Sequence, residues 1–282
     1  MKYKDKEIIL REKKSEDVLY LTYPILENTK IVKHGFSTRV GGVSEGFLGS
    51  MNLSFSRGDD EECVRENFRR MAKALEVSME DFVFSMQTHT TNVRKVTEED
   101  RGKGILRPLD YQDVDGLITD IPGLCLATFY ADCVPLYFVD PVHKAIGLSH
   151  SGWRGTVRRM GEVTLKRMQE EYGTDPADVT AAIGPSICQE CYEVSEDVII
   201  EFQKQFDEKH WEALFYRKEN GRYQLDLWKA NEIILLEAGV CKEKIAVTNL
   251  CTCCNHEELF SHRASNGKRG NLAAFLSLKE CV

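Results

Sequence analysis

The stretch LCLATFYADCVPLYFVDPVHKAIGLSH (124–150) decides the fold of this chain. Two apolar runs of strand type, 124–131 and 134–139, are separated by Asp132-Cys133. The tetrapeptide DPVH (140–143) is typical of a turn, and the run at 145–150 is typical of a returning strand. The stretch therefore predicts three successive, deeply buried strands with polar residues at their ends.

Helices and strands alternate irregularly on both sides of this stretch. We predict helices over 60–75, after GWRGT (152–156) up to Asp175-Pro176, after the N-cap Ser195, and over 227–238 up to Gly239. We predict strands over 82–86, 179–183, 245–250 and 271–278. The order lacks strict βαβ alternation, which favours an α/β (α+β) sandwich of helices around a mixed sheet. Because no linker or repeat interrupts the chain, we expect a single domain over residues 1–282.

Composition narrows the classes of function. Hydrophobic residues make up 42% and charged residues 29% of the 282 residues, as in chains that bury a core. No apolar run approaches the roughly 18 residues of a membrane span, and the N-terminus lacks the apolar run of a signal peptide. We therefore expect a cytoplasmic protein without a membrane partner. The net charge of −8 argues against nucleic-acid binding, although local arginines can still bind a small anion.

Three segments carry a metal-competent side chain at the end of an apolar strand. These are QTHT with His89, ADCVP with Cys133, and SHSGWRG with His150. Two imidazoles and one thiolate form a three-ligand set that leaves one tetrahedral position open, which is the design of a catalytic zinc site. The spacing itself is unspecific, because each of these residues taken alone is more often a buried core residue.

The neighbours of these residues add weight to the metal hypothesis. Small residues after His150 permit close backbone approach, and Arg154 can hold an anion there. Asp132, next to Cys133, can orient an imidazole, act as a general base, or simply form hydrogen bonds within the turn. The sequence leaves these alternatives open.

A second group of cysteines invites a different metal hypothesis. The chain has ten cysteines, and CQEC (Cys188, Cys191) and CTCC (Cys251, Cys253, Cys254) are accompanied by His256 and His262. In a reducing compartment such residues are ligands or buried thiols rather than disulfides. Because C-x-C-C is an unusual spacing for ligands, we expect ordinary buried thiols here.

Several motifs together resemble the YfiH-like laccase-domain family. They are GFSTRVGGVSEG (35–46), SMNLSF (50–55), QTHT, ADCVPLYFVDP, GLSHSGWRGT, AAIGPSICQECYEV and the final CT…LFSHR, and they span about residues 35–275. The resemblance implies a single-domain, three-layer α/β/α sandwich with a zinc ion bound by His89, Cys133 and His150. This chain reads HSGWRG and FSHRA where the family usually reads HAGWRG and FSYRR, and Ala264 in place of the second arginine weakens the expectation of an anion contact there.

The resemblance also implies an activity. Family members are similar to purine nucleoside phosphorylases that act on adenosine, inosine, guanosine and methylthioadenosine and that also deaminate adenosine. The expected partners are a nucleoside and phosphate, with Arg39 and Arg154 as phosphate ligands and Asn52 as a substrate contact or a turn residue. In deamination the metal would activate the water that attacks C6 of adenine.

Other functions compete with this one. The same two histidines and cysteine suit copper, and the family's older name points to a copper-dependent polyphenol oxidase. Multicopper oxidation needs more histidines than one such site supplies, however, and the chain has seven in all. A metal-free Cys133/His150 hydrolase or amidase would leave His89 without a role. A non-catalytic metal or ligand sensor is the remaining class. The sequence does not give the oligomeric state.

Overall fold

The computed structural model describes residues 1–280 and contains two mixed six-stranded sheets. The first sheet has the order β1 (Arg11–Ser15), β2 (Val18–Thr22), β3 (Val32–Ser37), β15 (Leu272–Leu278), β7 (Cys125–Tyr130) and β4 (Phe82–Phe84). The second has the order β14 (Ile245–Val247), β10 (Thr180–Ile183), β8 (Val134–Asp140), β9 (Ala145–Ser151), β6 (Gly116–Thr119) and β5 (Val93–Lys95). Parallel pairs (β4/β7, β10/β14, β5/β6) occur among antiparallel ones, so both sheets are mixed.

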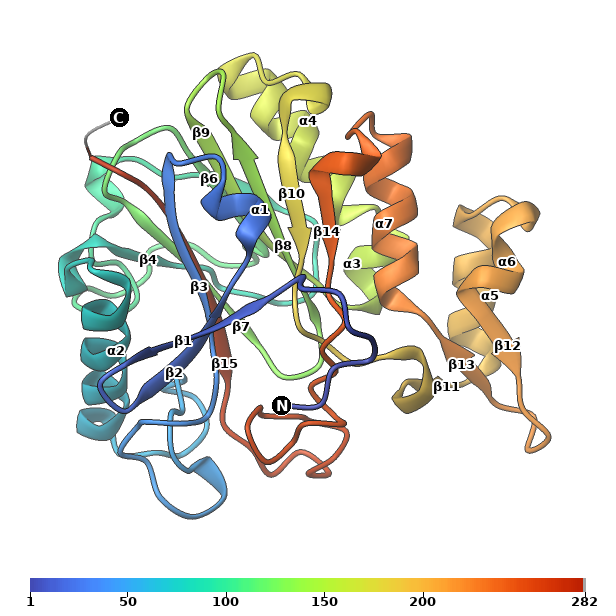
Figure 1. Cartoon of the computed structure of the whole chain (residues 1–282), viewed down its shortest axis with the longest axis horizontal. Helices are drawn as coiled ribbons and strands as arrows, with labels where there is room; N and C mark the ends of the chain where they lie inside the picture. The colour runs from blue at the N-terminus through green and yellow to red at the C-terminus, as the bar shows by residue number, and fades with distance from the viewer. Residues whose placement is uncertain (281–282) are drawn as a thin grey trace.

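Helices cover the outer faces of the two sheets (Figure 1). These are α2 (Glu61–Leu75) on the first sheet and α4 (Met160–Tyr172) with α7 (Leu227–Glu237) on the second. The remaining helices are α1 (Pro24–Glu27), which contacts β3 and β10, α3 (Trp153–Val157), α5 (Glu196–Gln205) and α6 (Trp211–Leu214). A small sheet of β11 (Glu193–Val194), β13 (Tyr223–Leu225) and β12 (Phe215–Arg217) lies beside α5 and α6 at the right of Figure 1.

Alternation along the strands divides the core into three layers of side chains. On β7, Cys125 and Ala127 pack under α2, whereas Leu126 packs between the two sheets. On β8, Tyr137 points to the inter-sheet layer and Phe138 to the layer under α4 and α7. The central strands are buried on both faces, which is why their sequences are almost continuously apolar.

The mixed α/β class expected from the sequence is confirmed, but the sandwich contains two facing sheets where one was expected. The stretch 124–150 changes sheet at Asp132-Cys133, because β7 belongs to the first sheet and β8 to the second. Both runs are almost continuously apolar, so their periodicity cannot reveal the change of sheet. The molecule thus has the layer order α2, first sheet, second sheet, α4 with α7.

Most of the predicted elements lie where the sequence placed them, and the main difference concerns the helix after GWRGT. It forms two helices, α3 and α4, separated at Arg159, whose φ is 59°. The second ends at Tyr172 on Gly173, before the expected Asp175-Pro176. Among residues 1–280, none of the helices combines the length and apolar character needed to cross a membrane.

Candidate functional site

Two loops and one strand at the edge between the two sheets bring His89, Cys133 and His150 together. His89 follows β4 of the first sheet, Cys133 lies in the connection from β7 to β8, and His150 is near the end of β9. One nitrogen of each histidine and the Cys133 sulfur all lie within 4.8 Å of one another. The two imidazoles meet edge to face, with ring centroids 5.0 Å apart.

The strand register explains why Cys133 lies beside His150. Strands β8 and β9 are antiparallel, and Pro135 is paired with His150. Cys133 lies two residues before Pro135, on the same side of the extended chain. His89 and Asp132 have φ angles of 66° and 87°, a left-handed region that non-glycine residues rarely occupy and that is enriched at functional sites.

A buried carboxylate, that of Asp115, orients the histidines. Its Oδ1 lies 2.8 Å from Nδ1 of His150, and the carboxylate accepts hydrogen bonds from the backbone amides of Thr88, His89 and Thr90 at 2.9, 3.1 and 3.0 Å. The hydrogen bond from Nδ1 leaves Nε2 of His150 as the ligand-competent nitrogen. A carboxylate behind a metal-binding imidazole is the usual support of such a ligand.

The electrostatics of the group favour an ionised thiol. Burial opposes ionisation of Cys133, but the neighbouring His150 and His89 outweigh burial and lower the pKa of the thiol to about 6. Burial likewise opposes the charged form of His150, yet Cys133 and Asp115 raise its pKa to about 9. Because a thiolate is the form that binds metals, Cys133 is prepared for a ligand's role near neutral pH.

The site fits a tetrahedral metal ion in its donor types and in its space. Two imidazoles and a thiolate are the ligands that zinc prefers, and copper accepts the same set. The glycine next to β9, Gly152, keeps this space open: a Cβ on it would lie 3.0 Å from Cδ2 of His89 and 3.1 Å from Sγ of Cys133. His89, Cys133 and His150 can therefore hold a metal ion.

The three residues line one end of a cavity of about 460 Å³. Its size is within the range of small-molecule sites. Apolar and aromatic side chains form much of the wall, namely Leu53, Phe55, Phe84, Met86, Leu109, Phe129 and Tyr130. The cavity thus joins a metal-competent end to an apolar surface that can bind a flat ring.

Arginines give the same cavity an anion-binding wall. Arg57, Arg107 and Arg269 all line it. Burial and the nearby charge of Arg57 lower the pKa of Arg269 to about 10. Within residues 1–280 the buried Nε of Arg269 has no hydrogen-bond partner, and its Nη1 donates to the Gly270 carbonyl and the Asn271 side chain, so the hydrogen-bonding capacity of this guanidinium is only partly used.

Asp132 forms hydrogen bonds with the surrounding loops and does not line the cavity. Its carboxylate accepts from the Thr252 hydroxyl at 2.7 Å and from the Arg263 amide at 2.7 Å, and its carbonyl accepts from the Ile187 amide at 3.0 Å. It holds the turn that presents Cys133. Of the alternatives left open by the sequence, this geometry favours hydrogen bonding within the loops.

The other expected contact residues lie outside the cavity. The guanidinium of Arg39 donates to the carbonyls of Gly49 and His256 and covers the ring of Phe260. Arg154 is exposed on α3 and stacks on Trp153. Asn52 is buried and ties the loop before Arg57 to Asn271, whose amide donates to its side-chain oxygen at 3.0 Å.

Several residues of the site do not belong to any motif that could have identified them from the sequence. Asp115 directly precedes the apolar strand β6, which pairs with β9, the strand that bears His150. An acidic residue before an apolar strand is the only indication of its role in the sequence. Arg57 and Arg269 belong to loops 212 positions apart that meet only through the fold. Cys188, Cys191, Cys251 and Cys254 also lie close together and form a second metal-competent cluster, a grouping that the sequence did not reveal.

Known proteins are similar to this chain in sequence and in fold. The chain is 36% identical over 255 residues to purine nucleoside phosphorylase YlmD of Bacillus subtilis, covering 90% of this chain and 91% of the relative. It is 37% identical over 265 residues to a purine nucleoside phosphorylase of Bacteroides thetaiotaomicron, covering 92% and 96%. The crystal structure of hypothetical protein YfiH from Bacillus licheniformis superposes with a TM-score of 0.89 at 35% identity, covering 97% and 100%.

A family model agrees with these likenesses. The model described as multi-copper polyphenol oxidoreductase laccase matches residues 33–279, close to the span over which the motifs occur. The two-sheet sandwich and the YfiH-like motifs are thus found together in one chain. This protein belongs to the multi-copper polyphenol oxidoreductase laccase family, the YfiH-like laccase-domain proteins.

Proposed function

We propose that this protein is a zinc-dependent purine nucleoside phosphorylase that also deaminates adenosine. Adenosine, inosine, guanosine and methylthioadenosine are the proposed nucleosides, and phosphate is the second substrate. The observation that carries the proposal is a single cavity that joins His89, Cys133 and His150 to the partly unsatisfied guanidinium of Arg269. The names of the relatives from Bacillus subtilis and Bacteroides thetaiotaomicron support it.

The reaction requires phosphate and nucleoside to lie side by side. A phosphate oxygen forms a bond to C1′ of the ribose while the bond from C1′ to the purine nitrogen breaks, and the departing base takes up one proton. The base would pack against the aromatic wall at Phe84 and Phe129, and Arg57 and Arg269 would bind phosphate oxygens. Two guanidiniums on one wall stabilise a dianion better than either does alone.

The proposed metal would be held by His89, Cys133 and His150, and when bound it supplies a Lewis acid for an oxygen of phosphate or of water. Asp115 keeps Nδ1 of His150 protonated, which holds the imidazole in a fixed orientation. The turn at Asp132 keeps the Cys133 sulfur at the cavity. Residues 1–282 would act as one domain, because strands from both ends of the chain, β3 and β15, pair in the first sheet.

Copper-dependent polyphenol oxidation is the alternative that the donor set and the family's description favour. Among residues 1–280, none of the histidines outside the site belongs to a group of potential metal ligands. His34 accepts the Tyr23 amide, and His143 pairs with Asp140. Within residues 1–280 the other metal-competent group consists of cysteines alone. Oxygen uptake on phenols would favour this alternative, whereas turnover by thoroughly metal-free protein would favour a Cys133/His150 hydrolase.

An assay of free-base release tests the proposal. Purified protein of known metal content is incubated with each nucleoside, with and without phosphate, and the products are separated by chromatography. Phosphorolysis predicts hypoxanthine and ribose 1-phosphate from inosine only when phosphate is present. Equal base release without phosphate would refute phosphorolysis, and absence of both inosine and hypoxanthine from adenosine reactions would refute deamination.

A further inference from the structure

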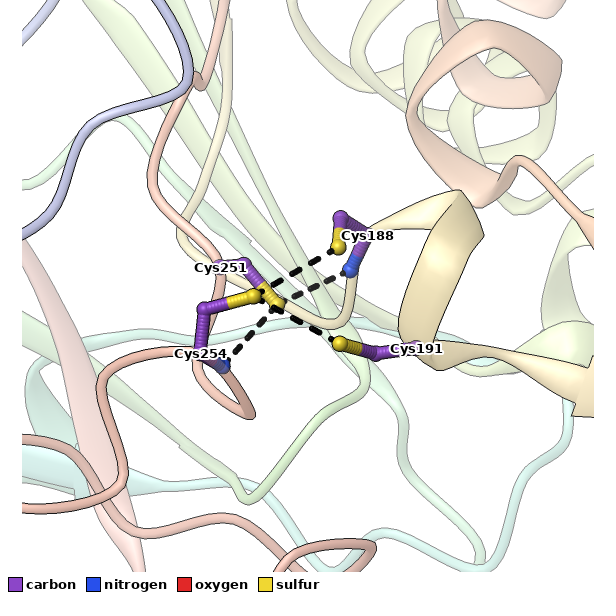
Figure 2. A group of neighbouring side chains, drawn as sticks. All are labelled: Cys188, Cys191, Cys251 and Cys254. Carbon is purple, nitrogen blue, oxygen red and sulfur yellow. Dashed lines mark hydrogen bonds between the residues drawn. The ribbon is translucent and has the colours of Figure 1, made fainter.

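Four cysteines from two distant segments form a compact cluster (Figure 2). Cys188 and Cys191 flank the first turn after β10, and Cys251 and Cys254 flank a turn after β14. Each pair has the spacing Cys-x-x-Cys, and the two turns face each other with all four sulfurs directed inward. Paired Cys-x-x-Cys turns are the usual scaffold of structural zinc sites.

The sulfur separations match a tetrahedral metal site. Sγ of Cys254 lies 3.5 Å from Sγ of Cys191 and 4.0 Å from Sγ of Cys188, and all four sulfurs lie within 4.8 Å of one another. A tetrahedral zinc ion with bonds of about 2.3 Å separates its sulfur ligands by about 3.8 Å. A disulfide needs about 2.05 Å, so the cluster has the size of a tetrathiolate site rather than of bonded pairs.

Backbone donors stabilise negative charge on the cluster. The amides of Cys188 and Cys254 donate to Sγ of Cys251 at 3.2 and 3.4 Å (Figure 2). The ammonium of Lys4 lies beside Cys188 and donates to Glu190 at 2.9 Å. Zinc with four thiolates carries a net charge of −2, so these donors and this cation offset part of the charge that metal binding creates.

The cluster joins the two segments that hold the Cys133 turn. The Ile187 amide, just before Cys188, and the Thr252 hydroxyl, just after Cys251, both donate to Asp132. The segments also pair directly, since the Thr252 amide donates to the Ser186 carbonyl at 3.1 Å. A metal ion bound to the four sulfurs would fix these segments around the loop that presents Cys133.

We propose that Cys188, Cys191, Cys251 and Cys254 bind a structural zinc ion, separate from the site at His89, Cys133 and His150. Binding displaces the protons of the four thiols and forms four zinc–sulfur bonds without electron transfer. All four coordination positions are filled by protein, so this zinc ion is closed to substrate. Its role is to stabilise the paired turns, whichever reaction the cavity performs.

Metal analysis of matched variants tests the second site. Protein is purified under reducing conditions from zinc-supplemented cells, and zinc, iron and copper per chain are measured by mass spectrometry. We expect about two zinc ions in the wild type, about one in Cys188→Ser or Cys254→Ser, and about one in Cys133→Ala. Cys253→Ser is the matched control, because Cys253 lies in the same turn but outside the four-sulfur cluster, and it should keep about two.

A second measurement needs no substitution within the four-cysteine cluster. Wild-type protein reconstituted with cobalt should show intense sulfur-to-cobalt charge transfer from a tetrathiolate, which Cys133→Ala retains. A lower melting temperature on removal of zinc from Cys133→Ala would support the structural role. Iron in place of zinc would overturn the zinc assignment. A Cys133→Ala protein without metal, or with disulfides between these cysteines by intact mass, would overturn the site.

Discussion

Nδ1 of His150 lies 2.8 Å from the carboxylate of Asp115, a residue 35 positions earlier in the chain. The same carboxylate accepts three backbone amides of the loop that bears His89. One buried acid thus determines the orientation of one proposed ligand and the loop conformation of another. Asp115 therefore links His150, on strand β9 of the second sheet, to the His89 loop, which follows strand β4 of the first sheet.

Asp115→Asn should weaken metal binding without unfolding the protein. The amide preserves the shape of the side chain but can no longer offer two anionic oxygens to Nδ1 of His150 and the loop amides. Loss of such a supporting carboxylate typically lowers metal affinity about 10–100-fold. Competition with a zinc chelator measures the affinity, and an unchanged zinc dissociation constant would show that Asp115 does not support the ligand.

Gly152→Ala should disturb the metal site through steric contact alone. Its Cβ would come 3.0 Å from His89 and 3.1 Å from Cys133, whereas the backbone φ of −75° is open to alanine. We expect a lower zinc content and a slower turnover at an almost unchanged melting temperature. Gly155→Ala is the control, because its Cβ would meet neighbours at ordinary distances of 3.5 Å or more. Equal behaviour of the two variants would refute the crowding argument.

Arg269→Lys should raise KM for phosphate far more than KM for nucleoside. Lysine keeps the positive charge but loses the planar fork that binds two phosphate oxygens. An increase of about 10-fold corresponds to the loss of about 1.4 kcal/mol, the scale of one charge-assisted hydrogen bond. Arg154→Lys is the matched control, since Arg154 is exposed outside the cavity. Steady-state kinetics with phosphate and nucleoside varied in turn give the two KM values for each variant. A greater rise in KM for phosphate in Arg154→Lys than in Arg269→Lys would place the phosphate site at Arg154 instead.

His34 should make stability depend on pH in mildly acidic solution. The imidazole is buried and accepts the Tyr23 amide at 2.8 Å, and burial lowers its pKa from 6.5 to about 4. The unfolded chain therefore takes up a proton first as pH falls, and the free energy of unfolding should decrease from about pH 6.5 down to about pH 4, by about 3 kcal/mol in total.

Urea denaturation of the wild type and His34→Gln at several pH values isolates this contribution. The wild type should be more stable by a margin that narrows as pH falls through this range. A margin that stays constant would mean that His34 is protonated as readily in the folded protein as in the unfolded chain.

The sequence predicted the strands best where burial made them uniform. The runs at 124–131, 134–139 and 145–150 correspond to β7, β8 and β9, because two-sided burial demands continuous apolar residues. The change of sheet between β7 and β8 was not predicted, because two apolar strands have the same sequence pattern whether they lie in one sheet or in two. The hairpin of β1 and β2 was also missed, because its exposed, charged residues show no clear alternation.

The candidate site shows the same contrast. His89, Cys133 and His150 lie at or shortly after the ends of strands, and chemical reasoning could identify them. Arg57 and Arg269 were not, because isolated arginines in polar loops resemble solvent-exposed ones until the loops are packed together. The grouping of the four cysteines was not predicted for another reason: Cys253 obscured the Cys-x-x-Cys spacing of Cys251 and Cys254.

The central claim is that phosphorolysis depends on a metal ion bound through Cys133. The most direct test measures zinc content and phosphate-dependent base release from inosine on the same preparations of wild type and Cys133→Ala. We predict that the variant contains about one zinc ion fewer per chain and loses at least about 100-fold in kcat/KM, consistent with removal of a group essential to the transition state. A Cys133→Ala protein that kept its full zinc content and full turnover would contradict the account.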